Sequence, residues 1–192
     1  MNLPAPTGPT TRPDLELVVP CHDEEAYLEA CVMRLLEELE VIGRPATITI
    51  VDSGSADRTW DLACRLAAEH GPVQALRVSE PGRGRALRAA WSRSSARVLG
   101  YTDVDLSADV GQLAAMWDAV DAGRADIAIA SRLATGSQVE RGLRREVLSR
   151  AYAELVQWVA APPFRDLQCG FKVLDAATCQ ALLPSVHDDA WF

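Results

Sequence analysis

Residues 101–107 read Tyr-Thr-Asp-Val-Asp-Leu-Ser, and this stretch lies at the junction of a predicted strand and a loop. Residues 96–100 before it are mostly apolar and too few for a helix, so they predict a buried parallel strand. After it, Asp109 is a helix-capping residue type ahead of apolar residues at helical spacing. Asp103 and Asp105 therefore lie where a strand opens into a loop, which is where open α/β sheets bind ligands.

The spacing of these two aspartates indicates a cation site. Carboxylates at i and i+2 share a face along a strand, and they repel each other unless a cation joins them. One or two carboxylates together with substrate phosphates is the usual way in which proteins hold Mg²⁺. An isolated Asp-x-Asp in a loop is more often a cap or turn, so the rest of the chain decides between the two interpretations.

The bulk composition predicts one soluble domain. A chain of 192 residues can bury a single core, which we expect over residues 14–192 after a disordered Pro- and Thr-rich tail at residues 1–13. No apolar run approaches the roughly 18 to 20 residues of a membrane span, and the amino terminus lacks the apolar core of a signal peptide. The apolar ending Trp191-Phe192 is abrupt, so we expect the fold to be truncated at its carboxyl terminus.

Cysteine usage and charge restrict the functional classes. The five cysteines are scattered and form no C-x-x-C pair, which indicates a reducing cytoplasm and no zinc site. A net charge of −8 argues against general nucleic-acid binding. Arginines nevertheless crowd residues 77–97 and 141–150, and guanidinium groups suit phosphate oxygens. Two solvated helix faces would produce the same pattern.

Strand-like and helical segments alternate along the first 130 residues. The strand-like runs are residues 15–19, 46–51, 73–78, 97–102 and 126–130. Helical spacing separates them at residues 24–41, at about 55–70, after the glycine-rich bend at 81–85, and after Asp109. This order predicts an α/β fold with a mostly parallel, doubly wound sheet and helices on both faces.

The later part of the chain is less regular. An irregular Gly/Ser/Thr loop is expected over residues 133–140, and a long half-apolar helix over about 143–160. Its apolar side either packs on the sheet or touches a membrane interface. The segment 166–174 and a short helix over residues 176–183 follow.

Polar residues follow the first, second and fourth predicted strands. Pro-Cys-His-Asp-Glu-Glu occupies residues 20–25, and Asp-Ser-Gly-Ser occupies residues 52–55. Plain structural roles exist for these residues, because Glu24 also suits a helix dipole and Asp52 could anchor its own turn. No G-x-G-x-x-G follows the first strand, which disfavours a dinucleotide-binding dehydrogenase.

The order of these motifs resembles that of the family 2 glycosyltransferases, which have the GT-A nucleotide-sugar fold. The motifs are Val-Val-Pro-x-x-x-Glu-Glu, Val-Asp-Ser-Gly-Ser-x-Asp-x-Thr, Gly-Arg-Gly, Asp-x-Asp, Ser-Arg and Asp-x-Gln-Cys-Gly-Phe-Lys. The resemblance covers Leu15–Phe192. Within the family, the chain is more specifically similar to the polyprenyl- and dolichyl-phosphate glucosyl- and mannosyltransferases. Residues 168–172 and the closing Trp191-Phe192 are most similar to the dolichyl-phosphate β-glucosyltransferase branch.

The resemblance implies a role for each matching position. The nucleotide base and ribose pocket would be lined by Pro20, His22, Glu24 and Asp52. Asp103 would lie beside the ribose and diphosphate, and Asp105 would be the main ligand of Mg²⁺ or Mn²⁺. The positions that handle donor and acceptor phosphates are matched by Arg132, Arg145 and Ser149. The segment flanking the sugar site is matched by Asp166, Gln168 and Lys172.

Four positions depart from the family pattern. Arg83 stands where the family usually has lysine, which keeps the charge but changes the shape. Asp23 replaces the usual asparagine after the first strand, and Ser53 replaces the second aspartate of the common Asp-Asp-Gly-Ser. Ser107 stands where some mannosyl enzymes use glutamine. The Asp23 change bears most directly on the contacts to the donor base.

The resemblance implies inverting transfer of glucose or mannose from UDP-glucose or GDP-mannose to a polyprenyl phosphate. A phosphate monoester has a second pKa of about 6, so this acceptor needs no general base. Arg145 and its neighbour Arg144 are the candidate phosphate clamp, whereas a hydroxyl acceptor would need a base such as Asp166. A soluble hydroxyl acceptor and an inactive nucleotide-sugar-binding module remain the alternatives. Peripheral contact with the cytoplasmic face of a membrane is expected for the lipid acceptor.

Overall fold

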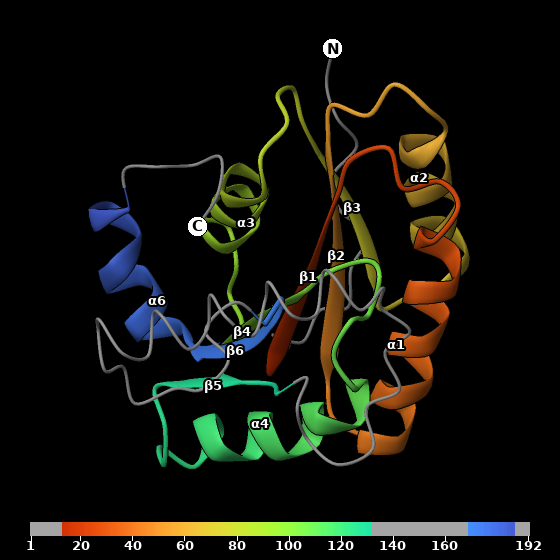
Figure 1. Cartoon of the computed structure of the whole chain (residues 1–192). Helices are drawn as coiled ribbons and strands as arrows, with labels where there is room; N and C mark the ends of the chain where they lie inside the picture. Colours follow the sequence, from red (N-terminus) through yellow and green to blue (C-terminus); the bar gives the residue numbers. More distant parts are fainter. Residues whose placement is uncertain (1–12, 132–168, 187–192) are drawn as a thin grey trace, which may run out of the picture.

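The computed structural model describes residues 13–131 and 169–186 (Figure 1). Four predictions fall outside these residues: the tail before residue 13, the loop over residues 133–140, the helix over residues 143–160 and the ending at Trp191-Phe192. So do five of the candidate site residues, namely Arg132, Arg145, Ser149, Asp166 and Gln168.

A six-stranded sheet in the order β3-β2-β1-β4-β6-β5 forms the centre of the molecule. Its strands are β1 (Leu15–Cys21), β2 (Ala46–Ser53), β3 (Val73–Val78), β4 (Val98–Thr102), β5 (Ile127–Ile129) and β6 (Phe171–Asp175). β1 pairs in parallel with both β2 and β4, and β2 pairs in parallel with β3. β1, β2 and β4 are almost entirely buried, as expected for apolar runs covered on both faces. The predicted doubly wound, mostly parallel sheet is confirmed.

β6 is the strand that the sequence pattern did not predict. It runs antiparallel to both β4 and β5 and separates them, with Gly100 opposite Val173. Its five residues mix apolar side chains with Lys172 and Asp175, so they lack the continuous apolar run by which buried parallel strands are recognised. The five predicted strands share one direction, and β6 alone in the described sheet opposes them.

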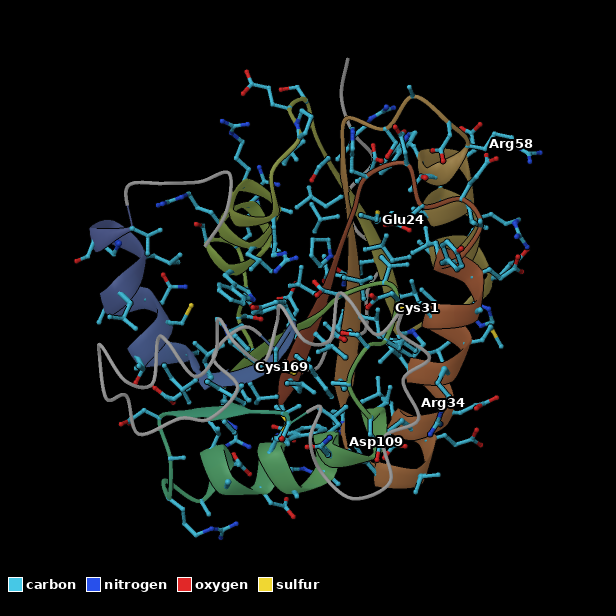
Figure 2. The ribbon with its side chains drawn as sticks, in the orientation of Figure 1. Glu24, Cys31, Arg34, Arg58, Asp109 and Cys169 are labelled. Carbon is cyan, nitrogen blue, oxygen red and sulfur yellow. The ribbon has the colours of Figure 1, made fainter. Side chains whose placement is uncertain are left out.

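Helices cover both faces of this sheet (Figure 1). One apolar cluster joins the sheet to α1 (Leu28–Ile42), α2 (Thr59–Glu69) and α4 (Leu113–Asp121). A second joins the opposite face to α3 (Arg83–Trp91) and α6 (Ala176–Leu182). Two 3₁₀ turns, η1 (Val110–Gln112) and η2 (Leu183–Ser185), complete the described elements. Exposed charged side chains such as Arg34 and Arg58 point outward, whereas Cys169 is buried (Figure 2).

Two helix starts differ from the helical spacing of the sequence. α1 begins at Leu28 rather than at the predicted Glu24. The Glu24 amide donates to the Thr59 hydroxyl at 2.8 Å, and the Glu24 carbonyl accepts from the Tyr27 and Leu28 amides, so the residues before α1 form a turn. Asp109, predicted as a cap, accepts a hydrogen bond from the Gly111 amide at 2.9 Å and starts η1. Residues 22–27 and 103–108 therefore form loops that follow β1 and β4.

Candidate active site

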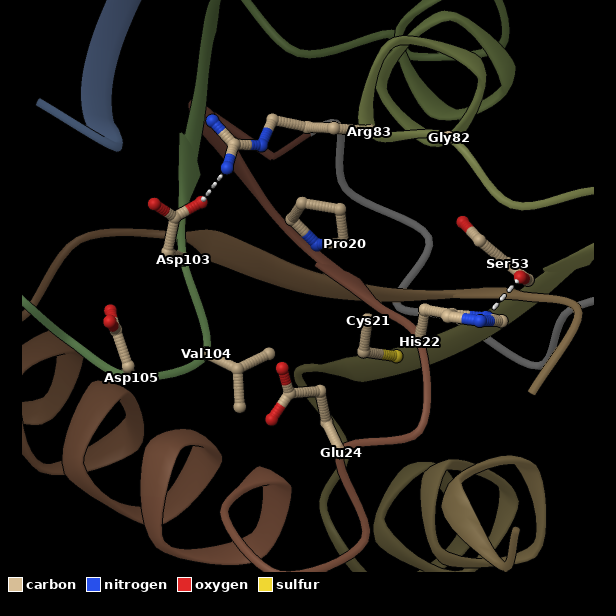
Figure 3. Close-up of a pocket in the computed structure, with 10 residues that line it drawn as sticks. All are labelled: Pro20, Cys21, His22, Glu24, Ser53, Gly82, Arg83, Asp103, Val104 and Asp105. Carbon is tan, nitrogen blue, oxygen red and sulfur yellow. Dashed lines mark hydrogen bonds and ion pairs between the residues drawn. The ribbon is translucent and has the colours of Figure 1, made fainter. Parts of the chain in front are cut away.

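An open cleft of about 270 Å³ lies at the carboxyl ends of β1, β2 and β4 (Figure 3). Parallel strands bring their carboxyl ends to one edge, so loops that are distant in sequence meet there. The lining residues come from these loops and from the start of α3: Pro20, Cys21, His22, Glu24, Ser53, Gly82, Arg83, Asp103, Val104 and Asp105. Most of the lining is therefore polar or charged.

The loops after β1 and β2 are fastened to each other. Asp23 adopts a φ of 55°, a left-handed conformation that Asp and Asn tolerate better than most residues. Its carboxylate accepts from the Ala56 amide at 2.8 Å, and its own amide donates to the Ser55 hydroxyl at 2.9 Å. Asp23, one of the departures from the family pattern, thus holds this wall of the cleft in place.

His22 is oriented by the same pair of loops. Its Nδ1 lies 2.8 Å from the Ser53 carbonyl oxygen, and a carbonyl oxygen only accepts, so Nδ1 carries the hydrogen. Its Nε2 lies 3.7 Å from the Asp23 carboxylate. The two loops thus fix the orientation of the imidazole ring where it lines the cleft.

Asp52 is fully buried beneath the cleft and does not line it. Its Oδ2 lies 2.9 Å from Arg77 Nε in an ion pair that lacks hydrogen-bond geometry. Its Oδ1 accepts a long hydrogen bond, 3.4 Å, from the Ser55 amide. These contacts match the anchoring role that Asp52 could have in its turn, and they place the carboxylate one layer below the groups that a ligand would meet.

Asp103 joins three segments of the chain. Arg83, at the start of α3, lies 3.3 Å from its Oδ1 (Figure 3). The Asp103 amide donates to the carbonyl oxygen of Gly170, directly before β6, at 3.1 Å. A carboxylate with a neighbouring guanidinium at a strand end is an arrangement that could accommodate both a cation and a phosphate.

Asp105 faces the cleft from the loop beyond β4. The side chain is exposed, and its Oδ1 accepts from the Ser107 amide at 3.0 Å. This contact is the turn-forming interaction that an isolated Asp-x-Asp predicts, but it uses one oxygen of the carboxylate. Asp105 can therefore both form the turn and serve as a cation ligand, since a turn that fixes one carboxylate oxygen also directs the other.

Glu24 adds a third carboxylate to the cleft. Partial burial raises the pKa of Glu24 above its ordinary value, and the nearby carboxylates of Asp105, Asp57 and Asp103 raise it further. The carboxylate contributions to this shift show that negative charges lie close together around Glu24. The cleft therefore favours a positively charged partner near these three side chains.

The donor chemistry fits a magnesium or manganese ion that is shared with a ligand. Within residues 13–131 and 169–186, no three Asp, Glu, His or Cys side chains form a metal-binding group by themselves. Mg²⁺ usually takes one or two protein carboxylates and completes its coordination with phosphate and water oxygens, and Mn²⁺ favours the same ligand types. Asp105 and Asp103 are the described residues that would hold such an ion.

Six of the candidate residues meet in this cleft: Pro20, His22, Glu24, Arg83, Asp103 and Asp105. Lys172 lies outside the lining, with its ammonium nitrogen 5.7 Å from the centre of the Tyr101 ring. The prediction missed four lining residues, namely Cys21, Ser53, Gly82 and Val104. Each lies within a motif already recognised, so its position next to a predicted site residue was the signal that could have identified it.

Comparisons with known proteins agree with this architecture. A family model described as Glycosyl transferase family 2 matches residues 16–183. Glycosyltransferase AglD of Haloferax volcanii is 33% identical over 183 residues, which cover 93% of this chain and 29% of AglD. Dolichyl-phosphate beta-glucosyltransferase of Drosophila melanogaster is 32% identical over 198 residues, covering 93% of this chain and 59% of that enzyme. The chain spans less than two thirds of these relatives.

Two solved structures share the fold at lower identity. The mannosyltransferase PcManGT from Pyrobaculum calidifontis, solved with GDP-Man and Mn²⁺, gives a TM-score of 0.58 at 22% identity and covers 93% of this chain and 48% of that one. Mannosyl-3-phosphoglycerate synthase from Rubrobacter xylanophilus gives 0.60 at 19% identity and covers 85% and 54%. With the family model matched over most of its length, the chain belongs to glycosyl transferase family 2.

Proposed function

We propose that residues 14–192 form the catalytic domain of an inverting, metal-dependent hexosyltransferase. The donor is UDP-glucose or GDP-mannose, with glucose favoured, and the acceptor is a polyprenyl or dolichyl phosphate. One observation carries the proposal: Asp103 and Asp105 face a cleft at the strand ends, and Arg83 stands beside Asp103. Dolichyl-phosphate glucosyltransferases among the relatives support the sugar and the lipid acceptor.

The cleft has the groups that departure of a nucleoside diphosphate requires. Negative charge accumulates on the diphosphate as the sugar leaves, and a divalent ion held there supplies Lewis-acid neutralisation. Asp105 and Asp103 hold that ion, and Arg83 donates to a phosphate oxygen. His22 and Glu24 also line the cleft, and we assign to them the nucleoside part of the donor.

A lipid phosphate acceptor simplifies the remaining chemistry. Its phosphate is largely ionised near pH 7, so the protein has to align two phosphate groups rather than remove a proton. Arg145, with Arg132 and Ser149, is proposed to align them, and Asp166, Gln168 and Lys172 to flank the sugar. None of the helices in residues 13–131 and 169–186 has the length and apolar character needed to cross a bilayer. Peripheral contact at the cytoplasmic face would bring the acceptor to the cleft.

The proposal is tested by transfer to a short-chain polyprenyl phosphate. Radiolabelled UDP-glucose, GDP-mannose and UDP-GlcNAc are supplied in turn, each with Mg²⁺, with Mn²⁺ or with EDTA. The expected result is transfer of one hexose that requires the metal and is lost in Asp105→Ala. Transfer to a sugar hydroxyl instead would identify a soluble acceptor. Metal-dependent binding of UDP or GDP without any transfer would identify a nucleotide-sugar-binding module.

A further inference from the structure

Gly170 lies against the carboxylate of Asp103. A Cβ at position 170 would overlap the Asp103 carboxyl group, and even the farther oxygen, Oδ1, would lie only 3.0 Å away. Real Cβ atoms essentially never approach other heavy atoms more closely than this. The space beside the Asp103 carboxylate is therefore available because residue 170 has no side chain.

The backbone conformation of Gly170 does not require glycine. The described glycines with positive φ are Gly43, Gly54, Gly82 and Gly123, and Gly170 is not among them. Alanine would adopt the local backbone conformation without the strain of the left-handed region. Contact with Asp103, rather than a turn, is what excludes a side chain at this position.

The neighbours of Gly170 leave little room for relief by backbone movement. Cys169 is fully buried, and Phe171 is 1% exposed. The Gly170 carbonyl oxygen accepts from the Asp103 amide at 3.1 Å, and the Ala130 amide donates to the Phe171 carbonyl oxygen at 3.0 Å. Because hydrogen bonds hold the carbonyls of Gly170 and of the strand residue after it, the Asp103 side chain is the group that moves most readily.

We propose that Gly170 is a positioning residue for Asp103. The missing side chain leaves the Asp103 carboxylate in the place where it pairs with Arg83, at 3.3 Å, and faces the cleft. Any larger residue at position 170 turns this carboxylate away from Arg83 and from the cation. The segment before β6 thus sets the geometry of a loop that follows β4. The effect on ligand binding rests on the proposed function, whereas the steric coupling does not.

A double-mutant cycle tests the coupling in the full chain. The four proteins are the unsubstituted chain, Gly170→Ala, Asp103→Ala and the double variant. Affinity for UDP and GDP is measured by calorimetry with Mn²⁺ and with EDTA, and stability is measured by urea unfolding. We expect Gly170→Ala to weaken Mn²⁺-dependent affinity about tenfold to hundredfold. In the Asp103→Ala background, the same substitution changes affinity by less than about twofold.

The urea measurements separate this inference from the proposed function. If the unsubstituted chain binds no nucleotide, the proposed function fails, but the cycle is still decided by stability. A lower urea midpoint for Gly170→Ala that is absent in the Asp103→Ala background supports the coupling. If Gly170→Ala alone does not fold and the double variant does, the coupling is supported equally. An equal loss of stability or affinity in both backgrounds, or no loss in either, overturns it.

Gly111→Ala is the matched control. Gly111 also lies beside an aspartate, and a Cβ there would be 3.3 Å from Asp109 Oδ1, a side chain outside the cleft that can adjust. This substitution is expected to leave Mn²⁺-dependent nucleotide affinity unchanged. A loss as large as that of Gly170→Ala would mean that any bulk near these loops disturbs binding, and the specific role of Gly170 would be rejected.

Discussion

Charged side chains gather at both ends of the parallel strands, but they are arranged in different ways. At the amino ends, Arg44 contacts Asp118 at 3.1 Å and Asp121 at 2.7 Å. Arg97 contacts Asp14 at 3.1 Å and Asp121 at 2.7 Å. Opposite charges alternate in this network, so the groups largely neutralise one another.

At the carboxyl ends, like charges are brought together instead. Glu24, Asp103 and Asp105 share the cleft, and Arg83 is the cationic side chain that lines it. Partial burial raises the pKa of Glu24, and this repulsion raises it further. The comparison teaches that balanced charges here connect elements of the fold, whereas unbalanced charges mark the place where a ligand must supply the missing charge.

The largest expected effect comes from substituting one aspartate at each end. Asp105→Ala should lower hexose transfer at least about hundredfold, because the cation then loses its main protein ligand. Its unfolding free energy should change by less than about 0.5 kcal/mol, since the side chain is exposed. Asp118→Ala is the matched change at the amino end and should leave transfer intact. Product formation and urea unfolding are measured for both variants. An equal loss of transfer in both would contradict the difference between the two ends of the strands.

Arg83 supplies the positive charge of the cleft. Arg83→Ala should weaken UDP or GDP binding about tenfold, in line with the loss of one charge-assisted hydrogen bond. Arg83→Lys should recover much of this affinity, because the ion pair to Asp103 involves one guanidinium nitrogen. Arg85, which pairs with Glu80 outside the cleft, provides the control Arg85→Ala. Calorimetric titration checks the series, and an equal loss in the Arg85 variant would contradict the prediction.

Arg44 provides the test at the opposite end. Its guanidinium carbon lies 3.9 Å from the centre of the Trp117 ring, in addition to the two ion pairs. Arg44→Ala should therefore lower the unfolding free energy by about 1 kcal/mol without affecting nucleotide binding. Arg44→Lys should recover only part of the loss, because lysine lacks the planar fork. Urea unfolding measures the change, and weakened nucleotide binding would show that the two ends are not independent.

The smallest effect is expected from Glu24→Gln. Because the folded protein raises the pKa of Glu24, the ionised carboxylate costs stability at neutral pH. Glutamine should increase the unfolding free energy at pH 7 by at most about 1 kcal/mol, since solvent screens the repulsion. The gain should disappear below the ordinary pKa of 4.5, where the carboxyl group is protonated in both the folded and unfolded states. Urea unfolding from pH 4 to 7 checks the sign, and a gain that grows on acidification would contradict it.

The fold was largely predictable because buried parallel strands appear in the sequence as short, continuous apolar runs. β6 was missed because its five residues include Lys172 and Asp175, and its place between β4 and β5 depends on pairing with distant segments. The helical spacing from Glu24 onward could not reveal that the Glu24 amide is taken by Thr59. Tertiary contacts decided both cases.

The candidate site was predictable as far as motifs at strand ends could indicate it. Asp103 and Asp105 follow directly from their position after β4, and both line the cleft. The sequence left open whether Asp52 meets a ligand or anchors its turn, since only the structure shows its burial against Arg77. Likewise, no local pattern connects Gly170 with Asp103, because that contact exists only once β6 has joined the sheet.

The late position of β6 in the chain has a consequence for biosynthesis. While a ribosome is still making residues 171–175, β5 has no neighbour in the described sheet and one edge of β4 is open. Open edges invite association with other chains, so the nascent protein is exposed to aggregation during this interval. The same event brings the Gly170 carbonyl to the Asp103 amide. Pairing of β6 therefore closes the sheet and fixes the backbone of Asp103 together.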